Sequence, residues 1–431
     1  MTKSIFTNVI RGEEEYLLHN TLHGTIIKAK CVLSKYLVDK LDQAQPFVFD
    51  ESNRFHQSLI EQKMVVDESL DEVSLLNYRF SQLSDDKLQV ILIVTRQCNL
   101  RCVYCYENHE DKRMGKEVYT NIINGIRKQV ASKGYRSVVI SLFGGEPMLE
   151  YEAICEFMNN VKNLSNEIGI DFFGQMTTNA YALTIDKLSN LVNLGVKYFQ
   201  ITLDGLKETH DASRCMVNGN GSWEKISRNL IHAKNSNVGF KITIRTNFDS
   251  KIISNIDEYL SFLSKNFTND NRFLFHFEAV KKLGGKQDDT LNIDVNESSE
   301  WSKLINNTNQ FGLKMHLYSA TPFSYMCYAS KVNHLVVDTD GTLMKCTICI
   351  DSEHNVVGKT SNIGFEIEDE KICNWVAFNL PKKCYDCSIL ALCFGRMCPG
   401  ARNTQEKNEG GYCLTHNENY YSSMRKRFNV E

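Results

Sequence analysis

A regular alternation of strand patterns and helix patterns runs through the middle of this sequence and constrains its fold more than any other feature. Short apolar runs bounded by polar turns predict buried strands, whereas apolar residues spaced three and four apart predict helices that cover a sheet. Repeated strand-then-helix units favour a parallel sheet, because parallel strands need a crossover connection. Six such units predict an α/β fold with a partial (β/α)6 barrel over residues 86–285 and ligand chemistry at the carboxyl ends of its strands. The strand candidates are Leu88–Thr95, Ser137–Phe143, Asp171–Thr177, Tyr198–Leu203, Lys241–Thr246 and Phe273–Val280, and the helix candidates are Val118–Ser132, Tyr151–Leu164, Ile185–Leu194, Trp223–Ala233 and Ile253–Leu263.

The composition excludes several classes of function. The 431 residues are 42% hydrophobic and carry a formal net charge of −3, which indicates a chain of several folded domains without a general basic surface for nucleic acid. The residues from Met1 to Asn8 lack the apolar core of a signal peptide, and no apolar run approaches the length of a membrane span. We therefore expect a cytoplasmic protein that binds neither nucleic acid nor membrane.

Three closely spaced cysteines follow the first predicted strand. Cys98, Cys102 and Cys105 stand on the loop that leaves this strand, where their thiolates can converge on one face of an iron–sulfur cube and leave its fourth iron without a protein ligand. Such an iron is a place for chemistry, as is the open position of a catalytic metal site. On these residues alone, a zinc knuckle or three incidental core thiols are the alternatives.

The CxxxCxxC spacing, with the aromatic Tyr104 just before the last cysteine, resembles the radical S-adenosylmethionine (SAM) superfamily. The resemblance implies that the free iron chelates the amino and carboxyl groups of SAM. It also implies that one electron from a donor of the flavodoxin or ferredoxin type cleaves SAM to a 5′-deoxyadenosyl radical. Tyr104 would lie near the adenine, and simple packing against the barrel mouth is the alternative for its ring.

A glycine pair with an acid ends the second predicted strand. Gly144, Gly145 and Glu146 resemble the GGEP motif of the same superfamily, which holds the amino group of SAM. Paired glycines let the backbone approach a ligand closely, and the neighbouring carboxylate can accept from an ammonium group. The position of the motif, one strand after the cysteines, is what makes it specific.

Two further motifs agree with this resemblance. Asn179, after the third strand, lies in a segment that resembles the TNG turn of the family. Thr202 and Arg214 have the spacing at which a hydroxyl residue and an arginine contact the ribose and carboxylate of SAM in anaerobic sulfatase-maturating relatives. A guanidinium can grip a carboxylate through two hydrogen bonds, although a surface salt bridge is the alternative for Arg214. Asp204 is equally compatible with ligand contact and with a turn before Gly205.

Nine of the fifteen cysteines fall in the last quarter of the chain, and their spacing favours metal or cluster ligation over disulfides. The order Cx13Gx4C, then Cx2Cx5Cx4C, then a last cysteine resembles the SPASM extension of radical SAM peptide-modifying enzymes, which carries two auxiliary [4Fe–4S] clusters. One departure is that four residues, where the family usually has three, separate the last two cysteines of the central run. Zinc could use the same ligands. The nine are Cys327, Cys346, Cys349, Cys373, Cys384, Cys387, Cys393, Cys398 and Cys413.

The resemblance implies a ligand set for each auxiliary cluster, in addition to the cluster at the first three cysteines. The outer cluster would take Cys384, Cys387, Cys393 and Cys413, and the inner one Cys327, Cys346 and Cys398. The fourth ligand of the inner cluster would be Cys349, in preference to Cys373, or else a position left open for a substrate atom.

The first 85 residues predict a small winged-helix-like module. Tyr16–Ala29 predicts two short strands that turn near Gly24, and a helix over Leu33–Leu41, with Ser34 as its possible N-cap, precedes a second helical segment at Phe55–Met64. The order resembles the element at the front of many ribosomal-peptide maturases, where a leader peptide adds as an extra strand. A structural cap without a partner is the alternative.

These observations predict four regions: a module over 1–85, the barrel over 86–285, a bridging region over 286–320 and a SPASM domain over 321–431. The function they favour is a radical SAM peptide maturase that installs an intramolecular carbon–carbon or thioether cross-link in a precursor peptide with a leader. Sulfatase maturases resemble this pattern but carry an aspartate where Thr347 stands, which makes an anaerobic sulfatase maturase the second choice. A zinc-stabilised binding protein is the alternative that is not an enzyme.

Overall fold

The chain forms two compact units, each assembled from separate stretches of sequence. The barrel unit comprises Asp85–His316 and Lys331–Val376, and the terminal unit comprises Met1–Ser84, Leu317–Ser330 and Ala377–Glu431. The computed structural model describes residues 1–43, 49–50, 52–83, 86–289, 291, 304, 307–316, 321–377, 380, 382–395, 398–399, 420–421, 424–425, 427–428 and 430.

Six parallel strands form the centre of the barrel unit. They lie across the sheet in sequence order, and each pairs in parallel with the next. This is the order that successive βαβ units produce, and it confirms the predicted α/β class and the parallel arrangement of the six predicted strands. The strands are β6 (Lys87–Thr95), β8 (Ser137–Gly144), β9 (Asp171–Thr178), β10 (Val196–Thr202), β12 (Lys241–Phe248) and β13 (Phe273–Ala279).

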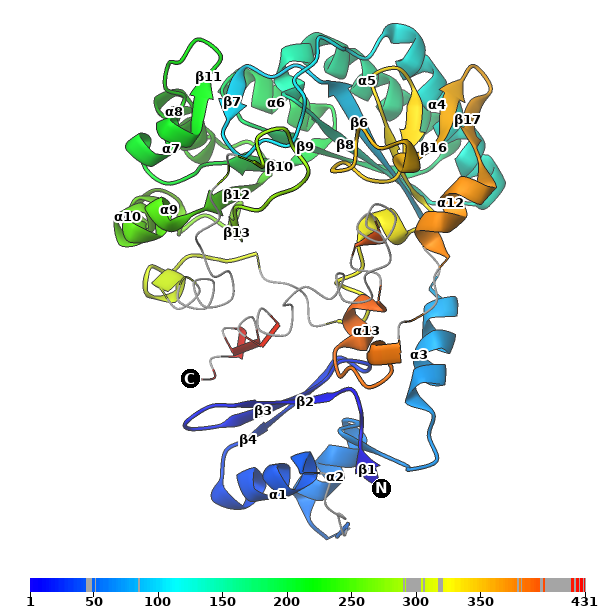
Figure 1. The fold of residues 1–431 in the computed structure, drawn as a ribbon, viewed down its shortest axis with the longest axis vertical. Coiled ribbons are helices and arrows are strands. Elements are labelled where there is room, and N and C mark those ends of the chain that lie inside the picture. Colours follow the sequence, from blue (N-terminus) through cyan, green and yellow to red (C-terminus); the bar gives the residue numbers. More distant parts are fainter. Residues whose placement is uncertain are drawn as a thin grey trace. The chain divides into compact units, whose positions relative to one another are not determined.

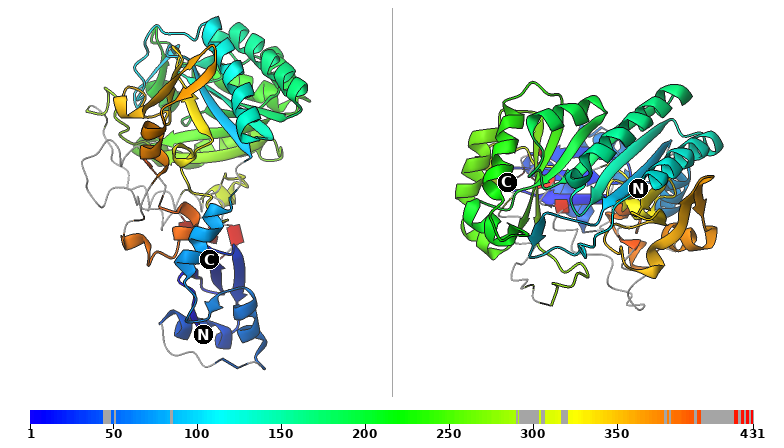
Figure 2. Two further views of the ribbon diagram at one scale, coloured as in Figure 1. Left: turned by 90° about the vertical axis from the view of Figure 1, so that its right-hand side faces the viewer. Right: turned by 90° about the horizontal axis from the view of Figure 1, so that it is seen from above.

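Amphipathic helices connect these strands and cover one face of the sheet (Figures 1 and 2). In α5 the buried residues Ile154, Phe157 and Val161 recur at helical spacing and form its sheet-facing stripe. Both α4 and α5 end at a glycine in the left-handed conformation, Gly134 and Gly169, which terminates a helix at little steric cost. The helices are α4 (Lys116–Lys133), α5 (Tyr151–Ile168), α6 (Ile185–Asn193), α7 (Lys207–Ser213), α8 (Trp223–Lys234), α9 (Ser250–Ser254) and α10 (Ile256–Phe267), with a 3₁₀ turn at Pro147–Glu150.

Four further strands, absent from the predicted barrel, extend the same sheet beyond β6. The first of them, β14, pairs in parallel with β6, and the other three follow in antiparallel order. Part of the segment that the sequence assigns to a separate cysteine-rich domain therefore belongs to the sheet of the barrel unit. These elements are β14 (His334–Val337), β15 (Thr342–Met344), β16 (Val356–Ser361) and β17 (Gly364–Ile367), accompanied by a 3₁₀ turn at Glu353–Asn355 and by α12 (Asp369–Val376).

The terminal unit contains the predicted N-terminal strands and helices. The strand pair turns at Gly24, whose φ of 67° is the left-handed conformation that glycine tolerates. The predicted N-cap of the first helix is wrong: Cys31 caps it and its sulfur accepts from the amide of Ser34, which lies inside the helix. The elements are β1 (Thr2–Lys3), β2 (Thr7–Arg11), β3 (Tyr16–Asn20), β4 (Thr25–Ala29), α1 (Val32–Asp42), α2 (Arg54–Glu61), β5 (Val65–Val66), α3 (Glu72–Ser81), α13 (Leu390–Cys393) and 3₁₀ turns at Tyr328–Ser330 and Lys382–Cys384.

The two ends of the chain share hydrophobic clusters within the terminal unit. Phe6 packs with Leu390 and Phe394 in one cluster, and Leu17 packs with Leu392 in another. The partly buried cysteines of the Cys384–Cys393 segment lie against these clusters. The N-terminal sheet and the cysteine segment are therefore parts of one folded core.

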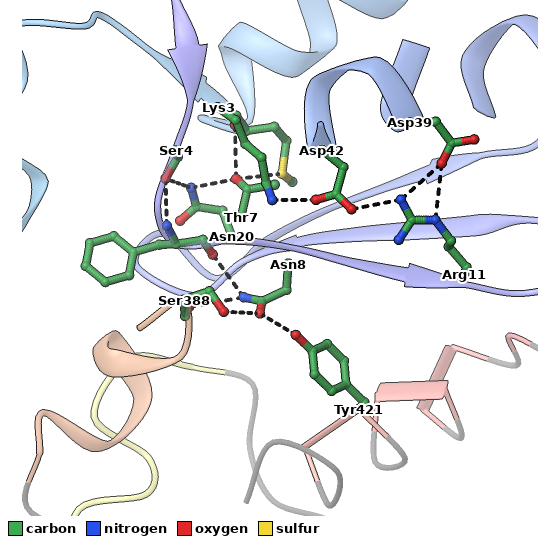
Figure 3. A network of polar contacts seen from close by, with 12 residues as sticks. Lys3, Ser4, Thr7, Asn8, Arg11, Asn20, Asp39, Asp42, Ser388 and Tyr421 are labelled. Atoms are coloured by element: carbon green, nitrogen blue, oxygen red, sulfur yellow. Dashed lines mark hydrogen bonds and ion pairs between the residues drawn. The ribbon is translucent and has the colours of Figure 1, made fainter. Parts of the chain in front are cut away.

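A polar network joins the same two segments (Figure 3). The amide of Asn8 donates to the carbonyl of Ser388 at 3.1 Å, while its oxygen accepts from the Ser388 hydroxyl at 2.6 Å and from Tyr421 at 3.1 Å. Thr21 also donates to the Ser388 carbonyl, at 2.7 Å. Because Asn8 is buried, each of these bonds replaces one that water would otherwise make.

Asn8→Ala is expected to destabilise the terminal unit by about 1–3 kcal/mol, because it leaves the partly buried hydroxyl donors of Ser388 and Tyr421 without their acceptor. Thermal unfolding and limited proteolysis within residues 377–395 report the loss. Asn163→Ala, on the exposed side of α5, is the control and should change neither. Equal protease resistance of Asn8→Ala and the wild type would contradict the role given to this network.

Candidate active site

The residues that the sequence singles out gather where parallel strands end. The cysteine loop follows β6, the glycine pair ends β8, Asn179 follows β9 and Thr202 is the last residue of β10. The carboxyl ends of parallel strands meet at one edge of a sheet, which is where such folds hold their ligands.

A two-stranded ribbon carries the cysteine loop toward the fourth strand. β7 (Leu100–Cys102) pairs in antiparallel fashion with β11 (Arg214–Met216), and Arg214 lies directly opposite Cys102. The backbone thus brings the predicted carboxylate-binding arginine to the predicted cluster ligand. No spacing in the sequence indicates this pairing.

The glycine pair packs against the backbone that leads into the cysteine loop. The amide of Gly145 donates to the Thr95 carbonyl at 2.9 Å, and the amide of Glu146 donates to the Gln97 carbonyl at 2.8 Å. A Cβ on Gly144 would lie 2.3 Å from the Thr95 oxygen, and a Cβ on Gly145 would lie 2.2 Å from the Gln97 oxygen. A side chain is therefore excluded at both positions, and the pair holds the start of the cysteine loop in place.

Glu146 is buried and makes three hydrogen bonds. Its carboxylate accepts from the Met148 amide at 2.9 Å, from the Thr178 hydroxyl at 2.5 Å and from the Asn179 amide at 2.7 Å. Burial raises the pKa of Glu146 above its usual range, although these bonds and the charge of Arg214 act in the opposite direction. Since a carboxylate offers about four acceptor sites, this side chain braces the turn and keeps room for one more donor.

The turn after β9 connects to the cysteine loop through its asparagine. Asn179 donates from its side chain to Asn99 at 2.8 Å and accepts from the Tyr181 amide at 2.9 Å. The next residue, Ala180, is buried and has a φ of 60°, although it carries a Cβ. Alanine thus occupies the left-handed position that glycine holds in the TNG turn that this segment resembles.

The three thiols of the cysteine loop lie near one another and are shielded from water. Cys102 is buried, and Cys98 and Cys105 are partly buried. Burial raises the pKa of Cys98 and of Cys105 to about 12. The charge of Glu146, followed by those of Cys102 and Cys105, adds to the increase at Cys98, and the charge of Cys102 adds to the increase at Cys105. Thiolates bind iron, so assembly of a cluster here must release protons.

A buried network connects the cysteine loop with the fourth and fifth strands. Tyr104 donates to Asp204 and accepts from Arg214 at 2.7 Å and from Asn247 at 3.1 Å. The Asn247 amide donates to the other oxygen of Asp204 at 2.7 Å. Burial raises the pKa of Tyr104 well above its usual range, so the phenol keeps the proton that it donates.

The guanidinium of Arg214 is fully enclosed and has spare donors. Among the described residues its Nε, although buried, has no hydrogen-bond partner, and a carboxylate oxygen of Asp204 lies 3.9 Å from its Nη1. Buried donors without acceptors are costly and rare in folded proteins. This group suits a bound carboxylate, and the glycine cradle beside the thiol trio suits a small ligand that meets a metal cluster, so the residues present fit SAM and a [4Fe–4S] cluster.

The cysteines assigned to auxiliary clusters lie in both units. Cys346, Cys349 and the exposed Cys373 belong to the barrel unit, whereas Cys327, Cys384, Cys387, Cys393 and Cys398 belong to the terminal unit, and Cys413 lies outside the described residues. Among the described residues, no group of three or more His, Cys, Asp or Glu side chains is arranged to hold a metal ion. The ligands of an iron–sulfur cluster each bind a different iron, so they lie farther apart than the ligands of one ion.

Asn355 organises the turn that carries Cys346 and Cys349. It is fully buried; its side-chain oxygen accepts from the amides of Lys345 and Cys346 at 3.0 and 2.9 Å, and its nitrogen donates to the carbonyls of Cys346 and Cys349 at 2.7 and 2.9 Å. One amide group thus fixes the backbone of both cysteines. Asn355 lies outside the cysteine spacing, so no pattern in the sequence points to it.

Other polar residues of the site are also missed from sequence. Asn99 and Asn247 hold the predicted Asn179 and Tyr104, and His210 braces Asp204 by accepting from its amide at 3.1 Å. The two asparagines form these contacts with segments far away in the sequence, whereas His210 lies on α7, six residues after Asp204. No spacing pattern in the sequence marks any of the three.

Comparison with known proteins identifies the class of the barrel. Residues 92–248 match the model of the Radical SAM superfamily, and the chain therefore contains a radical SAM domain. Among curated proteins, the cysteine-type anaerobic sulfatase-maturating enzyme of Clostridium novyi is 30% identical over 190 residues, which are 41% of this chain and 47% of that enzyme. Fe-coproporphyrin III synthase of Methanosarcina barkeri is 27% identical over 185 residues, 43% of each chain. The chain thus spans about half the length of these relatives or less.

Two solved structures share the fold over more of the chain. Native anSMEcpe with bound AdoMet and Kp18Cys peptide aligns with a TM-score of 0.61 at 17% identity, over 80% of this chain and 99% of that one. Streptococcus suis SuiB bound to precursor peptide SuiA aligns with a TM-score of 0.55 at 16% identity, over 95% and 97%. At these identities the likeness concerns the fold. In the described part of the chain, no helix has the length and hydropathy of a membrane span.

Gly145→Ala is expected to displace the start of the cysteine loop, because its Cβ would collide with the Gln97 carbonyl. Such overpacking costs about 1–3 kcal/mol of stability and should lower SAM affinity. Calorimetric unfolding and equilibrium dialysis of SAM measure the two effects. Gly115→Ala is the control, because a Cβ there meets nothing within 4 Å. Unchanged SAM affinity in Gly145→Ala would contradict the role of the glycine pair in positioning the cysteine loop for SAM.

Ala180→Gly is expected to stabilise the protein by about 1 kcal/mol, because a left-handed residue with a Cβ carries a steric penalty that glycine avoids. Ala233→Gly, inside α8, should show the ordinary effect and cost about 1 kcal/mol. Unfolding temperatures of the two variants therefore should shift in opposite directions. A lower unfolding temperature in both variants would show that the backbone at Ala180 is not strained.

Asn355→Ala is expected to lower stability by about 1–3 kcal/mol and to reduce the iron retained per chain, because it leaves several buried backbone groups around Cys346 and Cys349 unpaired. Thermal unfolding of the metal-free protein and iron analysis after reconstitution separate the two effects. Asn362→Ala, in the exposed turn between β16 and β17, is the control. Wild-type iron content together with wild-type stability in Asn355→Ala would refute the assignment.

Proposed function

We propose that this chain is a radical SAM enzyme that modifies a ribosomally synthesised precursor peptide by forming an intramolecular carbon–carbon or thioether cross-link. The observation that carries the proposal is the joint placement of the thiol trio, the glycine pair and the buried arginine opposite Cys102. The radical SAM domain and the two peptide-bound fold relatives support it.

Each site residue takes one role in this proposal. The bound cluster and SAM supply the chemistry, a one-electron cleavage to a 5′-deoxyadenosyl radical that abstracts a hydrogen atom. The protein orients SAM and excludes water: Arg214 grips its carboxylate, and Thr202 contacts the ribose. The ligands of the cluster are Cys98, Cys102 and Cys105, and the remaining contacts are Gly144, Gly145 and Glu146 at the amino group, Asn179 in the adjoining turn and Tyr104 beside the adenine.

Two auxiliary [4Fe–4S] clusters complete the proposed cofactor set. Asn355 holds the turn of Cys346 and Cys349, which makes Cys349 a better inner ligand than the exposed Cys373. The outer ligands Cys384, Cys387 and Cys393 lie in the core that they share with the N-terminal sheet. Within this proposal, the first 85 residues act as the winged-helix-like module that recognises the leader, and a flavodoxin or ferredoxin type protein donates the electron.

An anaerobic sulfatase maturase is the second candidate, because such an enzyme is 30% identical to this chain over 190 residues. Thr347, buried beside Cys346, stands where the maturases that the sequence resembles carry an aspartate. A threonine hydroxyl cannot take the role of a carboxylate base at neutral pH. This difference favours the cross-linking enzyme.

Anaerobic reconstitution should give about twelve irons per chain, from three four-iron clusters. After reduction, SAM should yield 5′-deoxyadenosine, and a peptide encoded beside this gene should lose a pair of hydrogen atoms localised to two residues by mass spectrometry. Conversion of a sulfatase-derived peptide instead would favour the second candidate. A colourless zinc protein that leaves SAM intact would reject both.

A further inference from the structure

Beside the proposed SAM site, polar residues from three neighbouring strands lie on one face of the sheet, the face opposite the buried apolar residues of β13. Strand register places Thr202, Arg245 and His276 side by side on β10, β12 and β13. Neighbours in register project to the same face. One pleat further along, Asn247 lies beside Glu278 in the same way. The opposite face of β13 is apolar and buried, so only this face offers polar groups.

His276 and Glu278 form a hydrogen-bonded pair at the end of β13. Nε2 of His276 lies 3.2 Å from a carboxylate oxygen of Glu278, and both side chains are partly buried. An ionised carboxylate only accepts, so the Nε2 nitrogen must carry the hydrogen, and Nδ1 of the neutral ring is left with a lone pair. Within the described part of the chain, no group donates to Nδ1. The pair is therefore an imidazole base oriented by a carboxylate.

The charges around this pair favour an anion. Lys281 donates to Glu278 at 2.7 Å, and the guanidinium of Arg245 acts on the same carboxylate. Burial would raise the pKa of Glu278, but the hydrogen bonds of His276 and Lys281 and the two positive charges lower it to about 2. Arg245 also acts on the buried carboxylate of Asp204, which Arg214 faces as well. Among the described residues, three cations, Arg214, Arg245 and Lys281, thus act on two carboxylates, Asp204 and Glu278, which leaves one positive charge in excess. His316, whose ring centroid lies 5.8 Å from that of His276, adds no negative charge.

The pair is connected to the SAM site through Asn247. Its side-chain oxygen accepts from Arg245 at 2.8 Å, and its nitrogen donates to Tyr104 at 3.1 Å. The chain after β13 then passes beside the cysteine loop, since a Cβ on Gly285 would lie 2.5 Å from the Cα of Tyr106. The base and the cysteine loop therefore belong to one continuous wall of the site.

We propose that His276, oriented by Glu278, is a catalytic base that takes the thiol proton of a substrate cysteine, and that Arg245 and Lys281 stabilise the resulting thiolate. This inference rests on the proposed function and names the reacting group of its peptide. In the step, the S–H bond breaks, its electron pair stays on sulfur, and the proton forms an N–H bond at Nδ1 of His276. The step consumes no oxidant. Glu278 is a positioning residue.

A thiol matches this site better than the other side chains that lose a proton. Its ordinary pKa of about 8.5 lies close to that of imidazole, whereas alcohols and amides are far weaker acids. A site with surplus positive charge also favours the thiolate over the thiol. An acidic side chain could occupy the same charges without giving up a proton, and it is the competing occupant in the test.

The first experiment needs no peptide substrate. Deuterium exchange at the imidazole C2 of each histidine is followed by mass spectrometry in the reconstituted, SAM-bound full chain. The probes are the N-acetyl amides of cysteine, serine and aspartate, each added at the same concentration. At about twice its Kd, the cysteine compound should slow exchange of His276 about threefold, and it should leave the exposed His232 of α8 unaffected. The serine compound should have no effect.

The same measurement in Glu278→Gln and Arg245→Met should show the protection reduced. Equal exchange with all three probes, or protection by the aspartate compound alone, would overturn the assignment of a thiol. The protection of His276 from deuterium exchange does not depend on SAM cleavage, so this measurement still decides the inference if the proposed radical chemistry fails.

The second experiment uses the substrate peptide once it is identified. His276→Gln should lower the rate of product formation by about 10²–10⁴-fold, the usual contribution of a general base. The ratio of 5′-deoxyadenosine to product should rise, because hydrogen abstraction is no longer followed by bond formation. Glu278→Gln should raise this ratio less, and His232→Gln should match the wild type. A wild-type ratio in His276→Gln would refute the proposal, whereas a wild-type chain that cannot cleave SAM would refute only the proposed function.

Discussion

The close contact between the glycine pair and the backbone before the cysteine loop is the constraint on which the site depends. Two carbonyls, of Thr95 and Gln97, accept from successive amides at the end of β8, and no side chain fits between the two strands at this point. The contact makes the first strand end where the second one ends. This contact fixes the residues that a ligand would touch. The cysteine loop begins directly after Gln97, and Glu146, directly after the glycine pair, accepts from the amides of Met148 and Asn179 and so holds the turn after β9.

Much of the barrel could be predicted because its information is local. The apolar period of each strand and helix is set by its own residues, so all six predicted strands and four of the five predicted helices are found near their expected bounds. The fifth prediction, one helix over Ile253–Leu263, is wrong, because the chain breaks at Asn255 into α9 and α10, and the short helix α7 was not predicted. The extension of the sheet by β14 could not be predicted in this way. Its pairing with β6 joins segments about 245 residues apart through backbone groups that any sequence supplies. The N-cap at Cys31 is a local contact, but it was missed because a thiol is an uncommon capping group.

The candidate site shows the same division. Cysteine spacing and the glycine pair are sequence patterns, and the structure brings their residues together with Arg214. Asn99, Asn247 and Asn355 carry no pattern, yet each holds a predicted residue in place through its amide. An asparagine has both donors and an acceptor on one short side chain, so it can pair the buried backbone N–H and C=O groups of a turn. In the sequence, such a residue looks like any other polar loop residue. The proposed roles of Tyr104 and Thr202 toward SAM stay predictions.

The shared core of the terminal unit changes how leader recognition has to be tested. Phe6 and Leu17 of the N-terminal sheet pack with Leu390 and Leu392, which flank the cysteines of the proposed outer cluster. Removing the first 85 residues would expose these leucines to water at a cost of about 1.5–3 kcal/mol for each buried side chain. A truncated chain that lost peptide affinity could therefore have lost its cysteine segment first. Lys28 of β4 is unsuitable for such a test, because it donates to the carbonyl of Phe428, which packs against this core. Lys30, an exposed residue just after β4 that pairs with Glu15, is the better position, and its substitution separates recognition of a leader from support of a cluster.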